Sequence, residues 1–117
     1  MHEKAVCKEI IDICLQAKED YHLEDIYSVT LKVGIHSCVH KGQLEYLFQI
    51  AKQETDLKNT RLLFEDEPYQ VQCLDCSHIY QPSFDTLITC EKCHSERYRV
   101  VSGYDCFVDH IDGKPIQ

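Results

Sequence analysis

Two pairs of cysteines constrain the fold of this chain more than any other feature. Each pair has the spacing C-x-x-C, and the two pairs are separated by residues 77–89. A C-x-x-C turn places two sulfur atoms on one side of a tight loop, and two facing turns supply the tetrahedral thiolate set that Zn²⁺ favours. The spacing therefore predicts a zinc-binding module whose ligands are Cys73, Cys76, Cys90 and Cys93.

Two other interpretations of these cysteines fit the sequence less well. Redox-active C-x-x-C motifs occur singly, at the start of a helix in a β-α-β setting, whereas both pairs here are flanked by turn-forming and polar residues. A catalytic zinc keeps a coordination position open for water, and four thiolates leave none. We therefore expect a structural Zn²⁺, which supplies the folding free energy of a segment too short to bury a core.

The remainder of the 117-residue chain has the patterns of one compact unit of helices and strands. Residues 1–20 and a second segment around 44–51 have apolar side chains at helical spacing, whereas residues 27–33 and 98–111 have strand-like patterns. Another strand is expected to start at Leu62, and the tail 112–117 is expected to be loose. The predicted division is an α+β domain of residues 1–68 plus 98–117, with a zinc-binding domain of residues 69–97 inserted between two strands.

The charge of the chain argues against recognition of nucleic acid. Asp and Glu number 20 against 12 Lys and Arg, so the formal net charge is −8. The cysteine module is itself acidic, and four thiolates with one Zn²⁺ make it more so. Such a surface repels phosphate. A zinc-ribbon module that binds nucleic acid or another protein is nevertheless the alternative function that we retain.

Several other classes of protein are also disfavoured. No segment is long and apolar enough to span a bilayer, and no signal-peptide pattern begins the chain, so we expect a cytoplasmic protein without membrane association. No phosphate-binding loop or Ser/His/Asp arrangement stands out, so no enzymatic activity is predicted. The cysteines outside the two pairs are expected to be small buried side chains; these are Cys7, Cys14, Cys38 and Cys106.

The beginning of the chain offers a second set of metal donors. The α-amine of Met1, the backbone amide of His2 and the His2 imidazole can close fused chelate rings. This set of nitrogen donors suits square-planar Ni²⁺ or Cu²⁺. A histidine at position 2 is also common as an exposed residue of a frayed chain end, and this motif by itself leaves both interpretations open.

Taken together, these motifs resemble the HypA/HybF family of nickel metallochaperones for [NiFe]-hydrogenase maturation, and the resemblance covers nearly the whole chain. Residues 73–78 and 90–95 are most similar to the versions from Helicobacter-type bacteria, in which the family also serves urease. The segments that carry the resemblance are Met1-His2-Glu3, Val33-Gly34, Ser37-Cys38-Val39, Leu44 with Phe48, and the two C-x-x-C pairs.

The resemblance implies an α+β fold in which two helices pack on a three-stranded sheet and a zinc-ribbon-like module protrudes. It implies that Ni(II) binds transiently at the N-terminus, with His2 as the indispensable ligand, Glu3 adjacent and the Met1 amine as a further donor. The implied partners are a HypB-type GTPase, the hydrogenase large subunit and, for urease, its maturation proteins. A homodimer is left open.

Three further histidines are candidates for metal chemistry. Members of the family commonly carry an acidic residue where this chain has His40, which is either a substitute nickel ligand or an exposed residue at the start of the second helix. His78 and His94 lie close to the zinc ligands in sequence. They are either loop residues that cover the thiolates or metal-responsive groups, because imidazole titrates near neutral pH.

Overall fold

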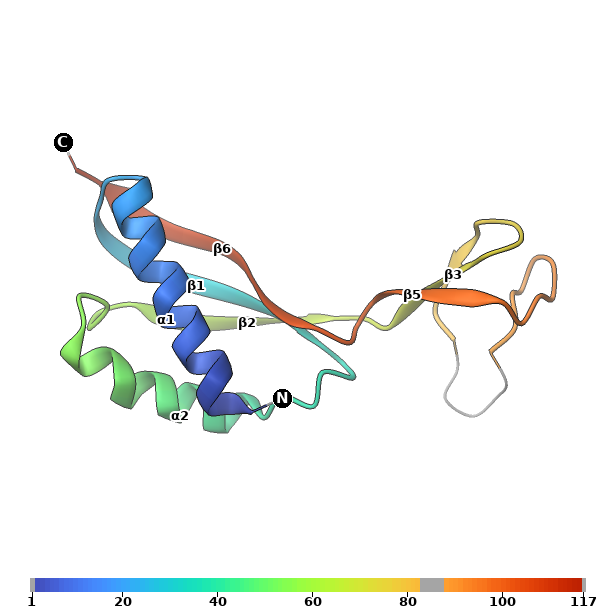
Figure 1. Cartoon of the computed structure of the whole chain (residues 1–117), viewed down its shortest axis with the longest axis horizontal. Coiled ribbons are helices and arrows are strands. Elements are labelled where there is room, and N and C mark those ends of the chain that lie inside the picture. Colours follow the sequence, from blue (N-terminus) through green and yellow to red (C-terminus); the bar gives the residue numbers. More distant parts are fainter. Residues whose placement is uncertain (1, 83–87, 117) are drawn as a thin grey trace.

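The computed structural model describes residues 2–82 and 88–116 and shows an elongated molecule with two small sheets (Figure 1). Its extents are 54 × 30 × 16 Å and its radius of gyration is 18.0 Å, whereas a compact domain of this length has about 13 Å. The described elements are α1 (Glu3–Asp20), β1 (Leu23–Gly34), α2 (Lys41–Ala51), the 3-10 helix η1 (Lys52–Glu54), β2 (Arg61–Glu67), β3 (Gln70–Cys73), β4 (Ile79–Tyr80), β5 (Tyr98–Ser102) and β6 (Cys106–Pro115).

The first sheet has the strand order β2-β1-β6, and both helices cover one of its faces (Figure 1). Strands β1 and β2 are parallel, and a parallel pair needs a crossover, which α2 supplies. Strands β1 and β6 are antiparallel, so Val33 lies opposite Asp66 on one side and Cys106 on the other. The prediction of an α+β fold with two helices on a three-stranded sheet is confirmed.

The core of this unit lies between the helices and the central strand. Helix α1 buries Cys7, Ile10, Ile11 and Cys14, which have the i, i+3, i+4, i+7 spacing of one helical stripe. Buried side chains from the other elements complete the core; they are Ile26, Val29, Leu31, Val33, Leu44, Phe48, Leu57 and Leu62. The metal sites considered below lie outside this core.

Two sequence-based expectations about this unit are wrong. Cys38 is exposed instead of buried, and its backbone has φ 61°, because it lies in the irregular segment between β1 and α2. The tail was expected to be loose from residue 112, but β6 continues to Pro115, which pairs with Leu23. The long β1 supplies a template for the tail, a long-range contact that the local sequence does not reveal.

The second sheet has the order β4-β3-β5, and its described residues form only a small core. Val71, Cys73, Tyr80 and Cys90 form its buried cluster, so half of the cluster consists of cysteines. Strand β5, which the sequence pattern grouped with the α+β unit, pairs here with β3, and Tyr98 lies opposite Cys73. A unit with so little apolar burial needs another source of folding free energy.

A narrow neck joins the two sheets. It consists of the two connections between them, residues 68–69 between β2 and β3 and residues 103–105 between β5 and β6, and it lies against the end of β1. Three backbone hydrogen bonds cross it: Gly34 N–H donates to the Asp105 carbonyl (2.8 Å), Ile35 to Glu67 (3.1 Å) and His36 to Gly103 (2.8 Å). The His36 ring contacts two tyrosines there, Tyr69 at 4.7 Å and Tyr104 at 5.3 Å between ring centroids. Residues from three separate segments therefore fix the direction in which the second sheet projects.

Two glycines allow the backbones of the neck to approach each other. A Cβ on Gly34 would lie 2.4 Å from the carbonyl carbon of Gly103, which is closer than real Cβ atoms approach. Gly103 itself has φ +103°, a conformation that other residues rarely adopt, and a Cβ there would lie 2.5 Å from Cα of Tyr69. The chain therefore bends sharply at Gly103, between β5 and β6.

We expect Gly34→Ala to destabilise the protein by about 2–3 kcal/mol, because the new methyl group must displace backbone on the opposite side of the neck. Gly42→Ala is the matched control, because a Cβ at Gly42 meets only the His40 ring, at 3.4 Å. Gly42 lies inside α2, where alanine is neutral or stabilising by up to about 1 kcal/mol. Urea unfolding of both variants measures the difference, and equal stabilities would contradict this account of the neck.

Candidate metal centre and N-terminal site

The structure brings Cys73, Cys76, Cys90 and Cys93 together, with all four sulfur atoms within 4.8 Å of one another. Two of the sulfur–sulfur distances, Cys73–Cys93 and Cys76–Cys90, are 3.5 Å. Four thiolates bound to one Zn²⁺ at ~2.3 Å have sulfur atoms about 3.8 Å apart. Within residues 2–82 and 88–116, this is the only group of three or more Cys, His, Asp or Glu side chains with ligand atoms so close together.

Each cysteine pair lies in the same kind of backbone turn. In the first turn, Ser77 N–H donates to the Cys73 carbonyl (3.0 Å) and Cys73 N–H to the His78 carbonyl (2.9 Å). The second turn repeats this pattern from Cys90, with His94 N–H and the Ser95 carbonyl as the corresponding partners at 2.8 and 2.9 Å. Both sulfur atoms of a pair are thereby held on one side of a loop, as the C-x-x-C spacing predicted.

A left-handed residue ends each turn directly after its second cysteine. Ser77 has φ 67° and His94 has φ 61°, and for residues other than glycine this conformation costs about 1–2 kcal/mol. The free-energy cost at these two equivalent positions must be offset by interactions of the four cysteines that the two turns bring together. Among the described residues of this unit, the buried apolar cluster around Val71 and Tyr80 is small.

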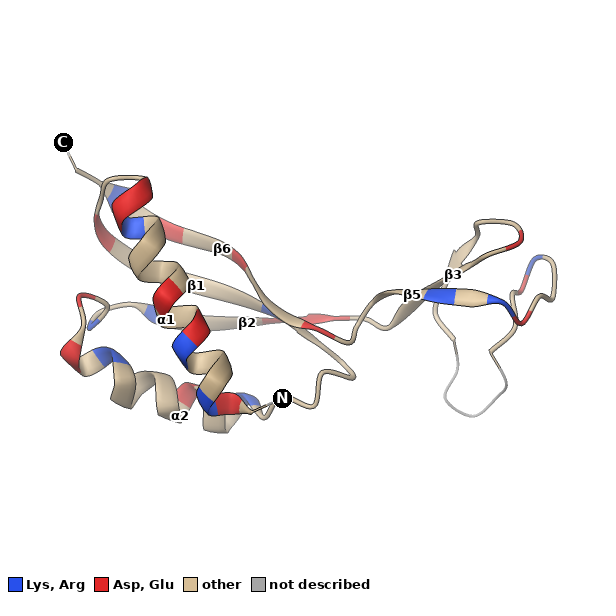
Figure 2. Cartoon of the chain, in the orientation of Figure 1, with Lys and Arg blue, Asp and Glu red and all other residues tan. Residues whose placement is uncertain are grey.

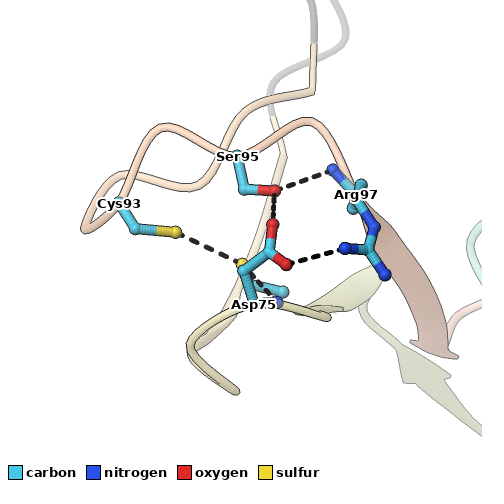
Figure 3. Close-up of polar contacts among 5 residues, drawn as sticks. Asp75, Cys93, Ser95 and Arg97 are labelled. Carbon is cyan, nitrogen blue, oxygen red and sulfur yellow. Dashed lines mark hydrogen bonds and ion pairs between the residues drawn. The ribbon is translucent and has the colours of Figure 1, made fainter.

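A polar clamp fastens the two turns to each other (Figure 3). The Asp75 carboxylate, which lies inside the first turn, accepts hydrogen bonds from the Ser95 hydroxyl and from Arg97, whose Nη1 is 3.0 Å away. The backbone N–H of Arg97 also donates to Ser95 Oγ at 3.1 Å. The sequence analysis did not identify this clamp, because no local pattern indicates that residue 75 meets residues 95 and 97.

The four thiols are too close together to ionise independently. Backbone N–H groups, that of Cys76 foremost, lower the pKa of Cys73 to about 6. The pKa of Cys93 is raised to about 12: the Ser95 backbone N–H favours its thiolate, but burial and the neighbouring sulfur atoms of Cys73, Cys76 and Cys90 outweigh it. A bound divalent cation removes the repulsion among thiolates. The donor set therefore fits Zn²⁺.

The two histidines of this unit lie outside the set of converging ligand atoms. His78 Nε2 is 2.7 Å from Glu91 Oε1, and its ring stacks on Tyr80 with 6.0 Å between centroids. His78 thus links the first cysteine turn to the second. His94 occupies the left-handed position described above. A metal-responsive role for either residue stays a prediction.

At the other site, the structure places Glu3 against the start of α2. The Glu3 carboxylate accepts a hydrogen bond from the backbone N–H of His40 at 3.0 Å, and this bond is the largest factor that lowers the pKa of Glu3. His40 is the N-cap of α2, and its Nδ1 accepts from the Gln43 backbone N–H at 3.1 Å. His2, the N-cap of α1, is exposed, and Met1 lies outside the described residues.

The fold and the four-cysteine cluster define a small α+β protein whose protruding sheet carries four cysteines placed to hold a metal ion. Its sequence matches the family described as hydrogenase/urease nickel incorporation, metallochaperone, HypA, over residues 1–113. It is similar to hydrogenase maturation factor HybF of Salmonella typhimurium, with 30% identity over 96% of this chain and 98% of that protein. It is also similar to hydrogenase/urease maturation factor HypA of Helicobacter pylori, with 29% identity over 88% of this chain and 89% of that one.

Solved structures agree with these similarities. The solution structure of the Ni metallochaperone HypA from Helicobacter pylori superposes with a TM-score of 0.76 and 26% identity, covering 99% of this chain and 100% of that chain. A second solution structure of a HypA protein gives a TM-score of 0.80, covering 97% and 96%. The chain belongs to the HypA/HybF family of nickel metallochaperones, whose members are maturation factors and not catalytic enzymes. In the described part of the chain, no helix has the length and apolarity needed to cross a membrane.

Removal of metal is expected to unfold the second sheet while the first stays folded, because two of the four residues in the smaller core are ligands. We expect Cys73→Ala, or chelation of the wild-type protein, to collapse the amide NMR signals of residues 70–80 and 90–102. The signals of α1 and β1 should persist. Cys38→Ala, which changes an exposed cysteine outside the cluster, should retain one zinc per chain. Simultaneous loss of both sets of signals would show that the sheets do not fold separately.

Proposed function

We propose that this chain carries Ni(II) at its N-terminus and delivers it during maturation of [NiFe]-hydrogenase and, where present, urease. The proposed nickel ligands are His2, Glu3, the Met1 amine and His40. Zn²⁺ at the four cysteines has a structural role, and the chain divides into a nickel-binding and a zinc-binding domain, with β5 (Tyr98–Ser102) in the zinc-binding one. Membership of the HypA/HybF family supports the cargo.

The observation that carries this proposal is the hydrogen bond between the Glu3 carboxylate and the His40 backbone N–H. These residues are far apart in the chain, and the bond draws the first turn of α1 to the first turn of α2. It therefore holds the chain end with His2 beside the one imidazole that replaces the family's acidic residue. Carboxylate and imidazole groups at an exposed chain end form an open site that can both take up and release a metal ion.

Capping of α2 gives a reason for weak, reversible binding. His40 Nδ1 accepts the Gln43 N–H, so the neutral ring carries its proton on Nε2. For Nε2 to bind nickel, the proton must move to Nδ1, which then no longer accepts a hydrogen bond. Loss of an N-cap costs about 1 kcal/mol. Nickel at His40 therefore competes with the capping of α2, which makes the metal easier to release.

The proposed partners follow from the family. They are a HypB-type GTPase, the hydrogenase large subunit and the urease maturation proteins, and a homodimer is a further possible assembly. A cytoplasmic location is supported by the eight cysteines, none of which forms a disulfide, because thiols stay reduced in the cytoplasm. The arginines of the second sheet support protein partners over nucleic acid, since Arg97 binds Asp75 and Arg99 binds Gln72.

Nickel binding should be micromolar or weaker and should depend on the chain end. We expect His2→Ala to abolish it, and an N-terminal extension of the wild-type chain to do the same by capping the amine. Affinity should also fall as the pH drops from about 7.5 to about 6, because imidazoles and α-amines then bind protons in competition with the metal. Calorimetric titration with Ni²⁺ measures all three effects, and undiminished affinity in both altered chains would place the site elsewhere.

His40→Asn separates the capping role of this residue from metal binding. Asparagine is a good N-cap, so the stability of the variant should stay within about 0.5 kcal/mol of wild type. The imidazole is lost, and we expect the nickel affinity to fall about tenfold, equivalent to about 1.4 kcal/mol. Unchanged nickel affinity would mean that His40 only caps α2.

A further inference from the structure

An apolar groove runs between α1 and β6. Its lining from α1 begins at Val6, one helical turn after His2. It consists of two hollows of about 250 and 480 Å³ that share Val108. From α1 it is lined by Val6, Ile10, Ile13 and Ala17, and from β6 by Cys106, Val108 and Ile111. Ile13, one of the apolar side chains at helical spacing in α1, remains 38% exposed. The apolar stripe of α1 is thus wider than the part that the core covers, and the uncovered part lines the groove.

The strand that borders this groove also has an unpaired edge. Strand β6 is the last strand of the order β2-β1-β6, and within the described chain it pairs only with β1. Backbone N–H and C=O groups on the other side of an edge strand are open to a further strand. A strand added there would direct every second side chain toward α1 and the groove, and the others toward the open face of the sheet.

The charges around the groove select the kind of segment that fits. Glu9 and Asp109 line it together with His110, and neither hollow is lined by Lys or Arg. On the neighbouring face of α1, Asp12 and Asp20 lie together with one cation, Lys8, so that this face is also acidic on balance. Figure 2 shows acidic and basic positions interspersed along α1. A second copy of this chain would place like charges against each other, and each copy has a net charge of −8. A cationic partner is attracted instead.

We propose that the outer edge of β6 and the groove beside α1 form a docking site for an extended segment of a partner protein. In this segment, apolar side chains alternate with Lys or Arg. The segment adds a fourth strand to the sheet, its apolar side chains enter the groove, and its cations lie near Glu9 and Asp109. Backbone hydrogen bonds provide affinity and the groove provides selectivity, as in other cases of strand addition. The site contains none of the proposed nickel ligands.

The test uses a short peptide in which Val and Ile alternate with Lys and Arg, added to the zinc-loaded, nickel-free protein. We expect amide NMR shifts along β6 and along α1 from Val6 to Ala17. A counterpart with Glu in place of Lys and Arg should bind at least about tenfold more weakly, a difference of about 1.4 kcal/mol. The affinity of the cationic peptide should decrease as salt is raised.

Two N-methylated peptides distinguish strand addition from simple attraction to an acidic surface. Methyl groups on alternate backbone nitrogens block the hydrogen bonds to β6 in one peptide and face solvent in the other. One should therefore lose binding while the other retains it. Equal binding of both peptides would overturn strand addition, and induction of helix in the peptide, seen by circular dichroism, would do so as well.

Matched variants test the groove. Ile13→Gln keeps a good helix former at an exposed position and should weaken peptide binding several-fold. Tyr46→Gln changes an exposed apolar side chain on α2 and should leave binding unaltered. Shifts confined to β2 or α2, or a protein dimer that involves the edge of β6 in the absence of peptide, would overturn the proposal. Nickel titration of Ile13→Gln should match wild type, so failure of the docking site is distinguishable from failure of the nickel site.

Discussion

The close approach of two backbone segments at Gly34 and Gly103 is the constraint on which the arrangement of this molecule depends. No side chain fits between them, and hydrogen bonds from residues 34–36 to the carbonyls of Glu67, Gly103 and Asp105 join the end of β1 to both connections between the sheets. Directly after this point the chain enters the segment that leads to His40 and α2. The same short stretch therefore orients the second sheet and positions the start of α2.

The two parts of the molecule are held together by different physical means. The first sheet buries a continuous apolar core under two helices, so the hydrophobic effect accounts for its stability. In its described part, the second sheet has a buried cluster of four side chains, two of which are cysteines, and two residues in the left-handed conformation. Its geometry is explained if a metal ion at the four thiolates offsets these costs.

The two groups of candidate ligands also differ in what they can do chemically. Four thiolates enclosed by two turns and by the Asp75–Ser95–Arg97 clamp suit an ion that stays in place. The candidate nickel donors lie at the start of the chain and at His40, which is exposed and already has a structural role as the cap of α2. A closed sulfur site and an open nitrogen and oxygen site match the proposed roles of a structural zinc and a transported nickel.

The sequence by itself determined the elements whose signals are local. Helical spacing predicted α1 and α2, and the C-x-x-C spacing predicted that four sulfur atoms converge, because the geometry of each turn depends on a few neighbouring residues. Tertiary structure alone decided the features that join distant segments. Pairing of Pro115 with Leu23 ordered the tail, pairing of β5 with β3 moved residues 98–102 into the second sheet, and Asp75 met Arg97 across the metal centre. Such contacts depend on how already formed elements pack, and no local pattern of residues encodes that.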